Sequence, residues 1–176
     1  MDELILVRPS LEYDSEIMKF RKELMEAKDE DYFAGCGSLK KCDTTREWLS
    51  ALAKMENEDT CPKGYVPSST YLAVRTFDNR AVGIIDLRHH INHPVLSAWG
   101  GHIGYSIRPS ERGKGYGKEM LKLVLQKCRE RNMDKVMVSC SRTNAASGKV
   151  ILANGGVFEK EVCVDGEFIK RYWIAL

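Results

Sequence analysis

The glycines and cations of the turn RGKGYGK, residues 112–118, are the residues whose types and spacing most directly imply chemistry. A strand-like stretch at 105–108 precedes this turn, and an amphipathic helical pattern follows it. Glycine allows a ligand to approach the backbone closely, and the first N–H groups of a helix lack intrahelical partners and lie at its positive end. The pattern therefore predicts a phosphate or pyrophosphate site, to which Arg112, Lys114 and Lys118 add charge-assisted hydrogen bonds.

Three glycine motifs compete for this turn. A P-loop requires Ser or Thr after Gly-Lys, where this chain has Glu119. A dinucleotide fingerprint requires G-x-G-x-x-G, and the spacing of Gly113, Gly115 and Gly117 does not match it. The third motif, R-x-x-G-x-G, is satisfied by Arg112, Gly115 and Gly117 between a strand and a helix. An ordinary glycine-rich connection is the remaining alternative.

Size and composition indicate one soluble domain. The chain has 176 residues, 43% hydrophobic and 30% charged, with a net charge of +2. This balance favours neither nucleic acid nor membrane as a partner, and no apolar run reaches the roughly 18 residues of a membrane span. The six cysteines are scattered without a C-x-x-C pair. We expect a reduced, cytoplasmic protein.

Hydrophobic periodicity predicts the element order β-α-α-β-β-β-α-β-α-β-β, an α+β fold with a mixed sheet in a single domain, 1–176. Thr44 and Glu47 form a capping-box pattern, Asn144 is a predicted helix cap, and Asp165-Gly166 is a hairpin signal. Helices are expected from Ser10-Leu11, from Thr44 to about 55, over 117–131 and from Asn144 to 153; strands are expected at 4–8, 70–76, 81–87, 100–108, 135–140, 157–164 and 167–174.

The R-x-x-G-x-G turn in this order of elements resembles the GNAT superfamily of acyl-CoA-dependent N-acetyltransferases, most strongly over residues 71–158. The resemblance implies transfer of acetyl from acetyl-CoA to a primary amine of a small molecule or peptide by direct attack. It also implies a gap between two strands, with Gly100, Gly101 and Gly104 compatible either with a bulge there or with an ordinary loop. The residues that it assigns to coenzyme A are Ser106, Ile107, Arg108, Arg112, Gly113, Lys114, Gly115, Tyr116, Gly117, Lys118, Asn144 and Ser147.

The resemblance also implies a proton donor to the departing thiolate. Many members place a tyrosine seven residues after the asparagine that matches Asn144, but this chain has Ile151 there. The nearest tyrosines in sequence are Tyr105 and Tyr116, and Tyr172 lies on the last predicted strand. The usual acid is therefore either replaced, with Tyr105 as the candidate, or absent. A thiol pKa of about 8.5 makes thiolate a tolerable leaving group even without an acid.

The acceptor amine must lose a proton, because only about 0.04% of an alkylamine is neutral at pH 7. His102 occupies the strand position where the family often has a basic carboxylate, and its ordinary pKa of about 6.5 suits a base. Asp86 is the second candidate, with Arg88 as its expected ion-pair partner. A structural role is the alternative for both residues.

His89, His90 and His93 do not form a metal-site pattern, so no metal is expected, and their loop is predicted to line the acceptor entrance. Two other functions remain open. Ile151 is compatible with a non-catalytic acyl-CoA-binding module, and the turn is compatible with a regulator that binds ATP or NAD. A homodimer is possible, since dimers are common in the family.

Overall fold

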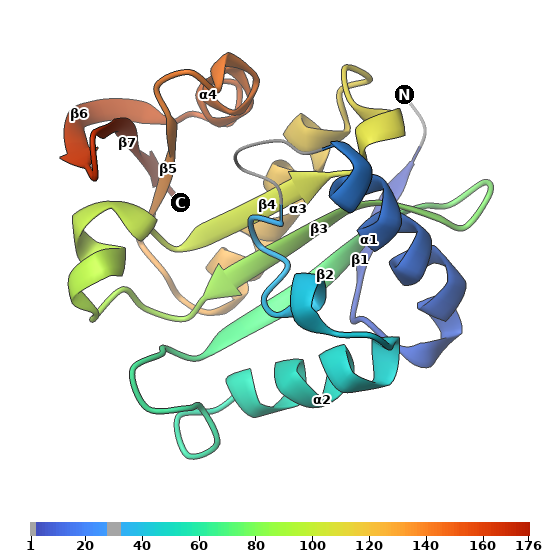
Figure 1. The fold of residues 1–176 in the computed structure, drawn as a ribbon. Helices are drawn as coiled ribbons and strands as arrows, with labels where there is room; N and C mark the ends of the chain where they lie inside the picture. Colours follow the sequence, from blue (N-terminus) through green and yellow to red (C-terminus); the bar gives the residue numbers. More distant parts are fainter. Residues whose placement is uncertain (1–2, 28–32) are drawn as a thin grey trace.

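The computed structural model describes residues 3–27 and 33–176, whose strands form one seven-stranded sheet in the order β1-β2-β3-β4-β5-β7-β6 (Figure 1). The predicted α+β fold and element order are confirmed. The strands are β1 Leu4–Val7, β2 Ser68–Arg75, β3 Arg80–Arg88, β4 Ile103–Ile107, β5 Lys135–Ser141, β6 Val157–Val164 and β7 Glu167–Ala175. The helices are α1 Asp14–Ala27, α2 Thr45–Met55, α3 Tyr116–Glu130 and α4 Ala145–Leu152, with short turns η1 Leu11–Tyr13, η2 Leu39–Lys41, η3 Leu96–Gly100 and η4 Pro109–Glu111.

Local signals explain where several elements begin and end. The Thr44 hydroxyl accepts the Glu47 amide at the start of α2, while the Glu47 carboxylate accepts the amide of Asp43, one residue before the usual partner of a capping box. Asp165 and Gly166 both have positive φ, at 50° and 87°, as a two-residue type I′ hairpin requires. Both predicted signals are therefore confirmed.

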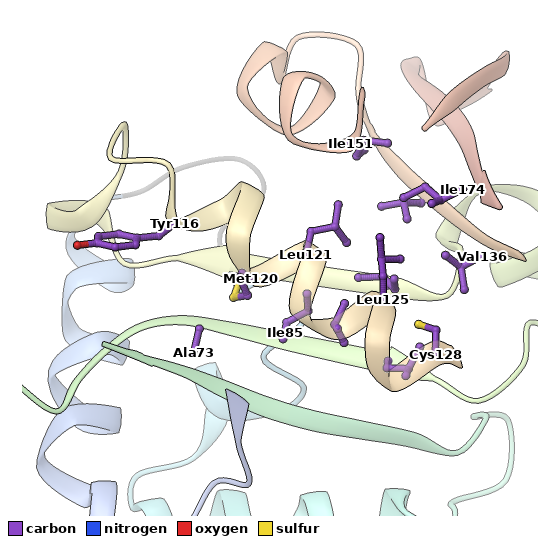
Figure 2. Packing of buried hydrophobic residues seen from close by; sticks show 14 of the residues in the cluster. Ala73, Ile85, Tyr116, Met120, Leu121, Leu125, Cys128, Val136, Ile151 and Ile174 are labelled. Carbon is purple, nitrogen blue, oxygen red and sulfur yellow. The ribbon is translucent and has the colours of Figure 1, made fainter. Parts of the chain in front are cut away.

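Helices cover both faces of the sheet (Figure 1). On one face, α1 and α2 bury Ile17, Phe20 and Trp48 against β2 and β3. On the other face, α3 and α4 pack against the strands, as Figure 2 shows for Met120, Leu121 and Leu125 of α3. The spacing of these three residues is the helical stripe expected from the sequence. Burial of this stripe fixes the orientation of α3 and hence the position of the turn that precedes it.

The sheet is nearly divided between β4 and β5. The two strands are parallel and pair at one register position, Ile103 with Val138, whereas β4 pairs with β3 along its whole length. Beyond Ile103 the two strands separate and form a fork. The fork is what the resemblance implied.

The glycines before the fork do not form the expected bulge. The strand predicted to begin at Gly100 begins at Ile103, because residues 96–100 form the π-helical turn η3. Gly101 ends that turn with φ +69°, and a Cβ there would lie 2.7 Å from the carbonyl oxygen of Met137. The β3–β4 register has no shift. These glycines therefore allow a turn that packs against β5, and the bulge prediction was wrong.

In the described ranges, no helix combines the length and the apolar character that crossing a bilayer would need.

Candidate functional site

The turn at 112–118 has the backbone conformation that an anion site requires. Gly113 and Gly115 have φ +76° and +88°, and Gly115 is the N-cap of α3. A Cβ on Gly113 would meet no atom within 4 Å, so this part of the backbone is open to a ligand. Gly117 is different, because a Cβ there would lie 3.3 Å from Val150 of α4. The first two glycines allow the backbone conformation, and the third allows α3 and α4 to pack closely.

A buried carboxylate, that of Glu111, holds this turn in place through ion pairs. Glu111, with a side chain 5% exposed, forms ion pairs of 2.9 Å with Arg75, 3.0 Å with Arg80 and 2.9 Å with Lys114. Burial acts to raise the pKa of Glu111, but the hydrogen bond from Lys114 and the three positive charges outweigh it and lower the pKa. Arg75 also donates to the hydroxyl of Tyr116, the first residue of α3. The β2–β3 hairpin therefore positions the turn.

The backbone of β4 alternates between its two neighbours. Next to the ends of β4, the amide of Arg88 donates to the His102 carbonyl at 2.8 Å, and the amide of Arg108 donates to the Val82 carbonyl at 2.9 Å. This pattern directs the backbone polar atoms of residues 104 and 106 toward β3, whereas the amide of His102 already points to β5. By the same alternation, the N–H and C=O groups of Tyr105 and Ile107 face the fork. This edge is available to hydrogen-bond an extended ligand.

A cavity of about 1100 Å³ runs through the fork. Its rear arm, on the side of α3 and α4, is lined by Ile107, Arg112, Gly113, Gly115, Gly117, Lys118, Asn144, Ser147 and Lys149. Its front arm, on the side of α1 and α2, is lined by Ala34, Gly35, Arg88, Val95, Leu96, Trp99 and Gly100. Between the two arms, Gly104 and Tyr105 of β4 and Ser139 and Cys140 of β5, which follow the single β4–β5 pair, also line the cavity. The cavity thus connects an anion-binding turn with a second compartment.

Helix α4 contributes the second wall of the rear arm. The Asn144 side chain accepts the amide of Ser147 at 3.0 Å, as predicted for a helix cap. The Ser147 hydroxyl lies 2.8 Å from the hydroxyl of Tyr105, which crosses from β4. Burial raises the pKa of Tyr105 to about 12, so its phenol remains protonated at neutral pH. Ile151 is fully buried in the core below α4 (Figure 2).

The front arm is shaped by the loop after α1. The Ser106 hydroxyl donates to the carbonyl of Ala34 at 2.8 Å. A Cβ on Gly35 would overlap the carbonyl oxygen of Gly104, so only glycine permits the loop to lie this close to β4. This contact brings the loop to the point where the strands separate. A contact between residues so far apart in the sequence leaves no local pattern, so the sequence alone does not predict it.

His102 lies outside the residues that line the cavity. Its Nδ1 accepts the amide of Met137 at 2.9 Å, while its own amide donates to the Met137 carbonyl at 2.8 Å. Burial, with a smaller effect from the charge of Arg88, lowers the pKa of His102 to about 4. The imidazole is therefore neutral at physiological pH, and its Nδ1 lone pair already binds β5. This geometry favours the structural role over the role of base.

Asp86 is also absent from the cavity lining. It accepts a hydrogen bond of 2.8 Å from Thr70 and pairs in register with Gly104, beneath the Gly35 loop. Burial raises the pKa of Asp86, although the charge of Arg88 and the hydrogen bond from Thr70 oppose this effect. Arg88, which the sequence suggested only as its partner, donates instead to the carbonyls of Gly100 and Gly101.

Two predicted coenzyme ligands direct their side chains elsewhere. Arg108 is 3% exposed and forms ion pairs of 2.7 Å with both Glu16 and Glu23 of α1. Lys114 pairs with Glu111, and neither Arg108 nor Lys114 lines the cavity. The other predicted coenzyme residues do line it: Ser106, Ile107, Arg112, Gly113, Gly115, Tyr116, Gly117, Lys118, Asn144 and Ser147.

The three loop histidines have separate hydrogen-bond partners. His89 lies 2.9 Å from Ser69, His90 lies 2.9 Å from Glu58, and His93 accepts the amide of Val95. None of the three lines the cavity, whereas Val95, Leu96 and Trp99 from the residues just after them do. The segment that follows the histidines therefore lines the front arm, but the histidine side chains do not.

The sequence over residues 3–157 matches the family described as Acetyltransferase (GNAT) domain. This span covers most of the chain, and the protein belongs to the GNAT acetyltransferase family. A search of curated protein sequences found no match.

Solved structures share the fold at low sequence identity. An acetyltransferase (GNAT family) from Bacillus anthracis is 16% identical with a TM-score of 0.65, covering 99% of this chain and 96% of the other. The microcin C7 self-immunity acetyltransferase, solved with acetyl-CoA and AMP, is 14% identical with a TM-score of 0.67, covering 100% and 94%. A ribosomal L7/L12 alpha-N-protein acetyltransferase, solved with coenzyme A, is 15% identical with a TM-score of 0.67, covering 98% and 94%.

Proposed function

We propose that this protein transfers an acetyl group from acetyl-CoA to a primary amine of a small molecule or peptide by direct attack. The observation that carries the proposal is the continuity of one cavity from the glycine turn, through the β4–β5 fork, to the front arm. Such a cavity accommodates two reactants that enter from opposite faces of a sheet. Structural relatives solved with acetyl-CoA or coenzyme A support this assignment.

The rear arm fits the coenzyme in charge and shape. In the proposal, backbone amides of 112–118 hold the pyrophosphate at the start of α3, with Arg112 and Lys118 nearby. The fork-facing backbone groups of Tyr105 and Ile107 pair with the pantetheine, and Asn144 and Ser147 form the opposite wall. The chemistry that acetyl-CoA supplies when bound there is an activated acetyl thioester.

The amine reaches this position from the front arm. Its nitrogen forms a bond to the acetyl carbon, the C–S bond breaks with its electron pair going to sulfur, the nitrogen loses one proton and the thiolate gains one. The N–H of Ile107 faces the fork, where it can stabilise negative charge on the acetyl oxygen. Backbone amides are fixed by the β4 pairing with β3, so they need no rearrangement during the reaction.

Tyr105 is the proposed proton donor to the thiolate. Its hydroxyl lies on the cavity wall beside Ser147, and its raised pKa keeps the phenol protonated, so it can donate a hydrogen bond to the sulfur as negative charge forms there. The proposal assigns no side-chain base. Among the described lining residues the one carboxylate is Glu111, which three cations already engage at the turn. The amine therefore loses its proton to water.

Two measurements test this function. Free-thiol release from acetyl-CoA is followed with a library of amines, and at least one amine must accelerate it well above hydrolysis. Thermal unfolding is followed with coenzyme A, acetyl-CoA, ATP and NAD, and the coenzyme A compounds must raise Tm most. Coenzyme-dependent stabilisation without turnover of any amine would favour the non-catalytic module, and stabilisation by ATP or NAD alone would favour the regulator.

A further inference from the structure

The front arm contains a cation that is oriented for a ligand. Arg88 lies at the end of β3 and lines the cavity, where its Nη1 donates to the carbonyls of Gly100 and Gly101 at 3.2 and 3.0 Å. Its Nη2 lies on the Gly104 side, 3.7 Å from where a Cβ on Gly104 would be. These two carbonyl bonds fix the plane of the guanidinium, and Nη2 donates no hydrogen bond to any residue within 3–27 and 33–176.

No carboxylate within residues 3–27 and 33–176 forms an ion pair with Arg88. Asp86 is on the same face of β3, but its carboxylate accepts from Thr70. Burial lowers the pKa of Arg88, and the charge of Asp86 only partly opposes this effect. A partly buried guanidinium with an open Nη2 lacks a direct anionic partner, and an anionic ligand would provide one.

The rest of the front arm is apolar or neutral. Val95, Leu96 and Trp99 form one wall, and Ala34 and Gly35 form the other. Glu111 lies at the far end of the cavity, at the turn. A polycationic acceptor would meet Arg88 with no acid beside it among the described lining residues. An acceptor with one negative group and an apolar part matches both features.

We propose that the acceptor is an amine that also carries a carboxylate, which binds Arg88 while an apolar portion lies against Leu96 and Trp99. The inference rests on the proposed acetyl transfer, and it names the substrate class of the front arm. With Nη1 bound to the two carbonyls, Nη2 can donate a charge-assisted hydrogen bond to a carboxylate oxygen. A free amino acid and a short peptide with an acidic side chain both present this chemistry.

Matched amines provide the test. With saturating acetyl-CoA, kcat/KM from thiol release is compared for phenylalanine and phenethylamine, for leucine and isoamylamine, and for the dipeptides Asp-Phe amide and Asn-Phe amide, with spermidine as a polycation. Each kcat/KM is calculated from the concentration of neutral amine, because the members of a pair differ in amine pKa. The proposal expects the carboxylate to increase kcat/KM by about tenfold or more in the amino-acid pairs or in the peptide pair. An increase in kcat/KM only in the amino-acid pairs would indicate a free amino acid as acceptor, and an increase only in the peptide pair would indicate a peptide with an acidic side chain. Equal rates within every pair, or a preference for spermidine, would overturn it.

Variants separate recognition from folding. Arg88→Gln should reduce the advantage of the carboxylate-bearing member to about parity and leave the acetyl-CoA Kd unchanged, and Arg88→Lys should retain part of the advantage. Arg129→Gln, an exposed arginine near the end of α3 and outside the cavity, is the charge-matched control and should keep the wild-type preference. If Arg88→Gln lowers kcat/KM equally for both members of each pair, Arg88 has only a structural role and the proposal is overturned.

Binding gives a readout that does not depend on turnover. Calorimetry compares N-acetylphenylalanine with N-acetylphenethylamine on the protein loaded with coenzyme A. If N-acetylphenylalanine binds more tightly and this difference disappears in Arg88→Gln, the proposal is supported even if no amine is acetylated. A lack of acetylation would contradict only the proposed acetyl transfer. Equal affinity of the two compounds, with coenzyme A bound, would overturn the assignment of Arg88 alone.

Discussion

The hydroxyl of Tyr105 on β4 lies 2.8 Å from the hydroxyl of Ser147 on α4, and this contact bridges the two walls of the rear arm. Tyr105 extends from the strand whose backbone faces the gap, and Ser147 lies in the first turn of the helix capped by Asn144. The contact therefore places a phenol in the cavity although Ile151 occupies the helix position where many family members have a tyrosine.

Tyr105→Phe tests whether this phenol donates a proton. The substitution keeps the ring in the core and removes the hydroxyl, so kcat should fall by roughly tenfold to a hundredfold while the acetyl-CoA Kd changes little. Stopped-flow thiol release and calorimetry measure the two quantities. Ser147→Ala is the control, since it removes the partner hydroxyl but leaves the phenol, and it should retain most of kcat. Wild-type kcat in Tyr105→Phe would remove Tyr105 from the mechanism.

The pH–rate profile tests whether the reaction proceeds without a side-chain base. If water receives the proton, the rate at subsaturating amine should rise tenfold per pH unit up to the pKa of the amine, because only the neutral amine attacks. Two amines whose pKa values differ by one unit should give profiles displaced by one unit. A plateau that begins at the same pH for both amines would reveal a protein base, and Asp86, whose pKa is raised by burial, would be the first candidate.

His102 should affect the pH dependence of stability more than that of catalysis. Its pKa is lowered by burial to about 4 in the folded protein, against 6.5 when unfolded, so the unfolded state binds the proton first. This contribution is fully present above pH 6.5 and is lost as the pH falls toward 4. The free energy of unfolding of wild type should thus fall by up to about 3 kcal/mol more than that of His102→Gln between these values.

Chemical denaturation at a series of pH values measures the difference in the free energy of unfolding between wild type and His102→Gln. The carboxylate titrations are common to both proteins and cancel in this difference. Parallel curves for wild type and His102→Gln would show that the imidazole does not titrate as its position between β4 and Met137 implies.

Arg108→Met should destabilise the protein without a direct effect on the coenzyme. The substitution leaves Glu16 and Glu23 without a cation at 2.7 Å, which should lower the free energy of unfolding by about 3 kcal/mol. Because Arg108 does not line the cavity, the acetyl-CoA Kd measured below the unfolding transition should remain within about threefold of wild type. A stable variant with a much weaker Kd would return Arg108 to the coenzyme site, where the sequence had placed it.

The sequence predicted the features that depend on neighbouring residues. The turn at 112–118, the apolar stripe of α3 and the Asp165-Gly166 hairpin each require a local backbone conformation or period that residue types reveal. The order of elements then followed, and so did the position of the fork, through the family resemblance.

Features that depend on contacts distant in sequence were not predicted. The imidazole of His102 binds Met137, and Gly35 packs on Gly104, across separations that leave no periodic signal. Arg88 looked like the partner of Asp86 because both share a face of β3, but its direction is set by the carbonyls of η3. Strand register decides such pairings, and register depends on the whole sheet.

Gly115→Val is the variant whose acetyl-CoA Kd tests the central claim most directly. A side chain at the N-cap of α3 would occupy the proposed path of the pyrophosphate and strain a residue at φ +88°, so calorimetry should show at least a tenfold weaker Kd than wild type. Gly64→Val is the matched control, since Gly64 has φ +87°, has no atom within 4 Å of a Cβ and lies outside the cavity, and it should keep the wild-type Kd. A folded Gly115→Val protein that binds acetyl-CoA as tightly as wild type would contradict the assignment of this turn to the coenzyme.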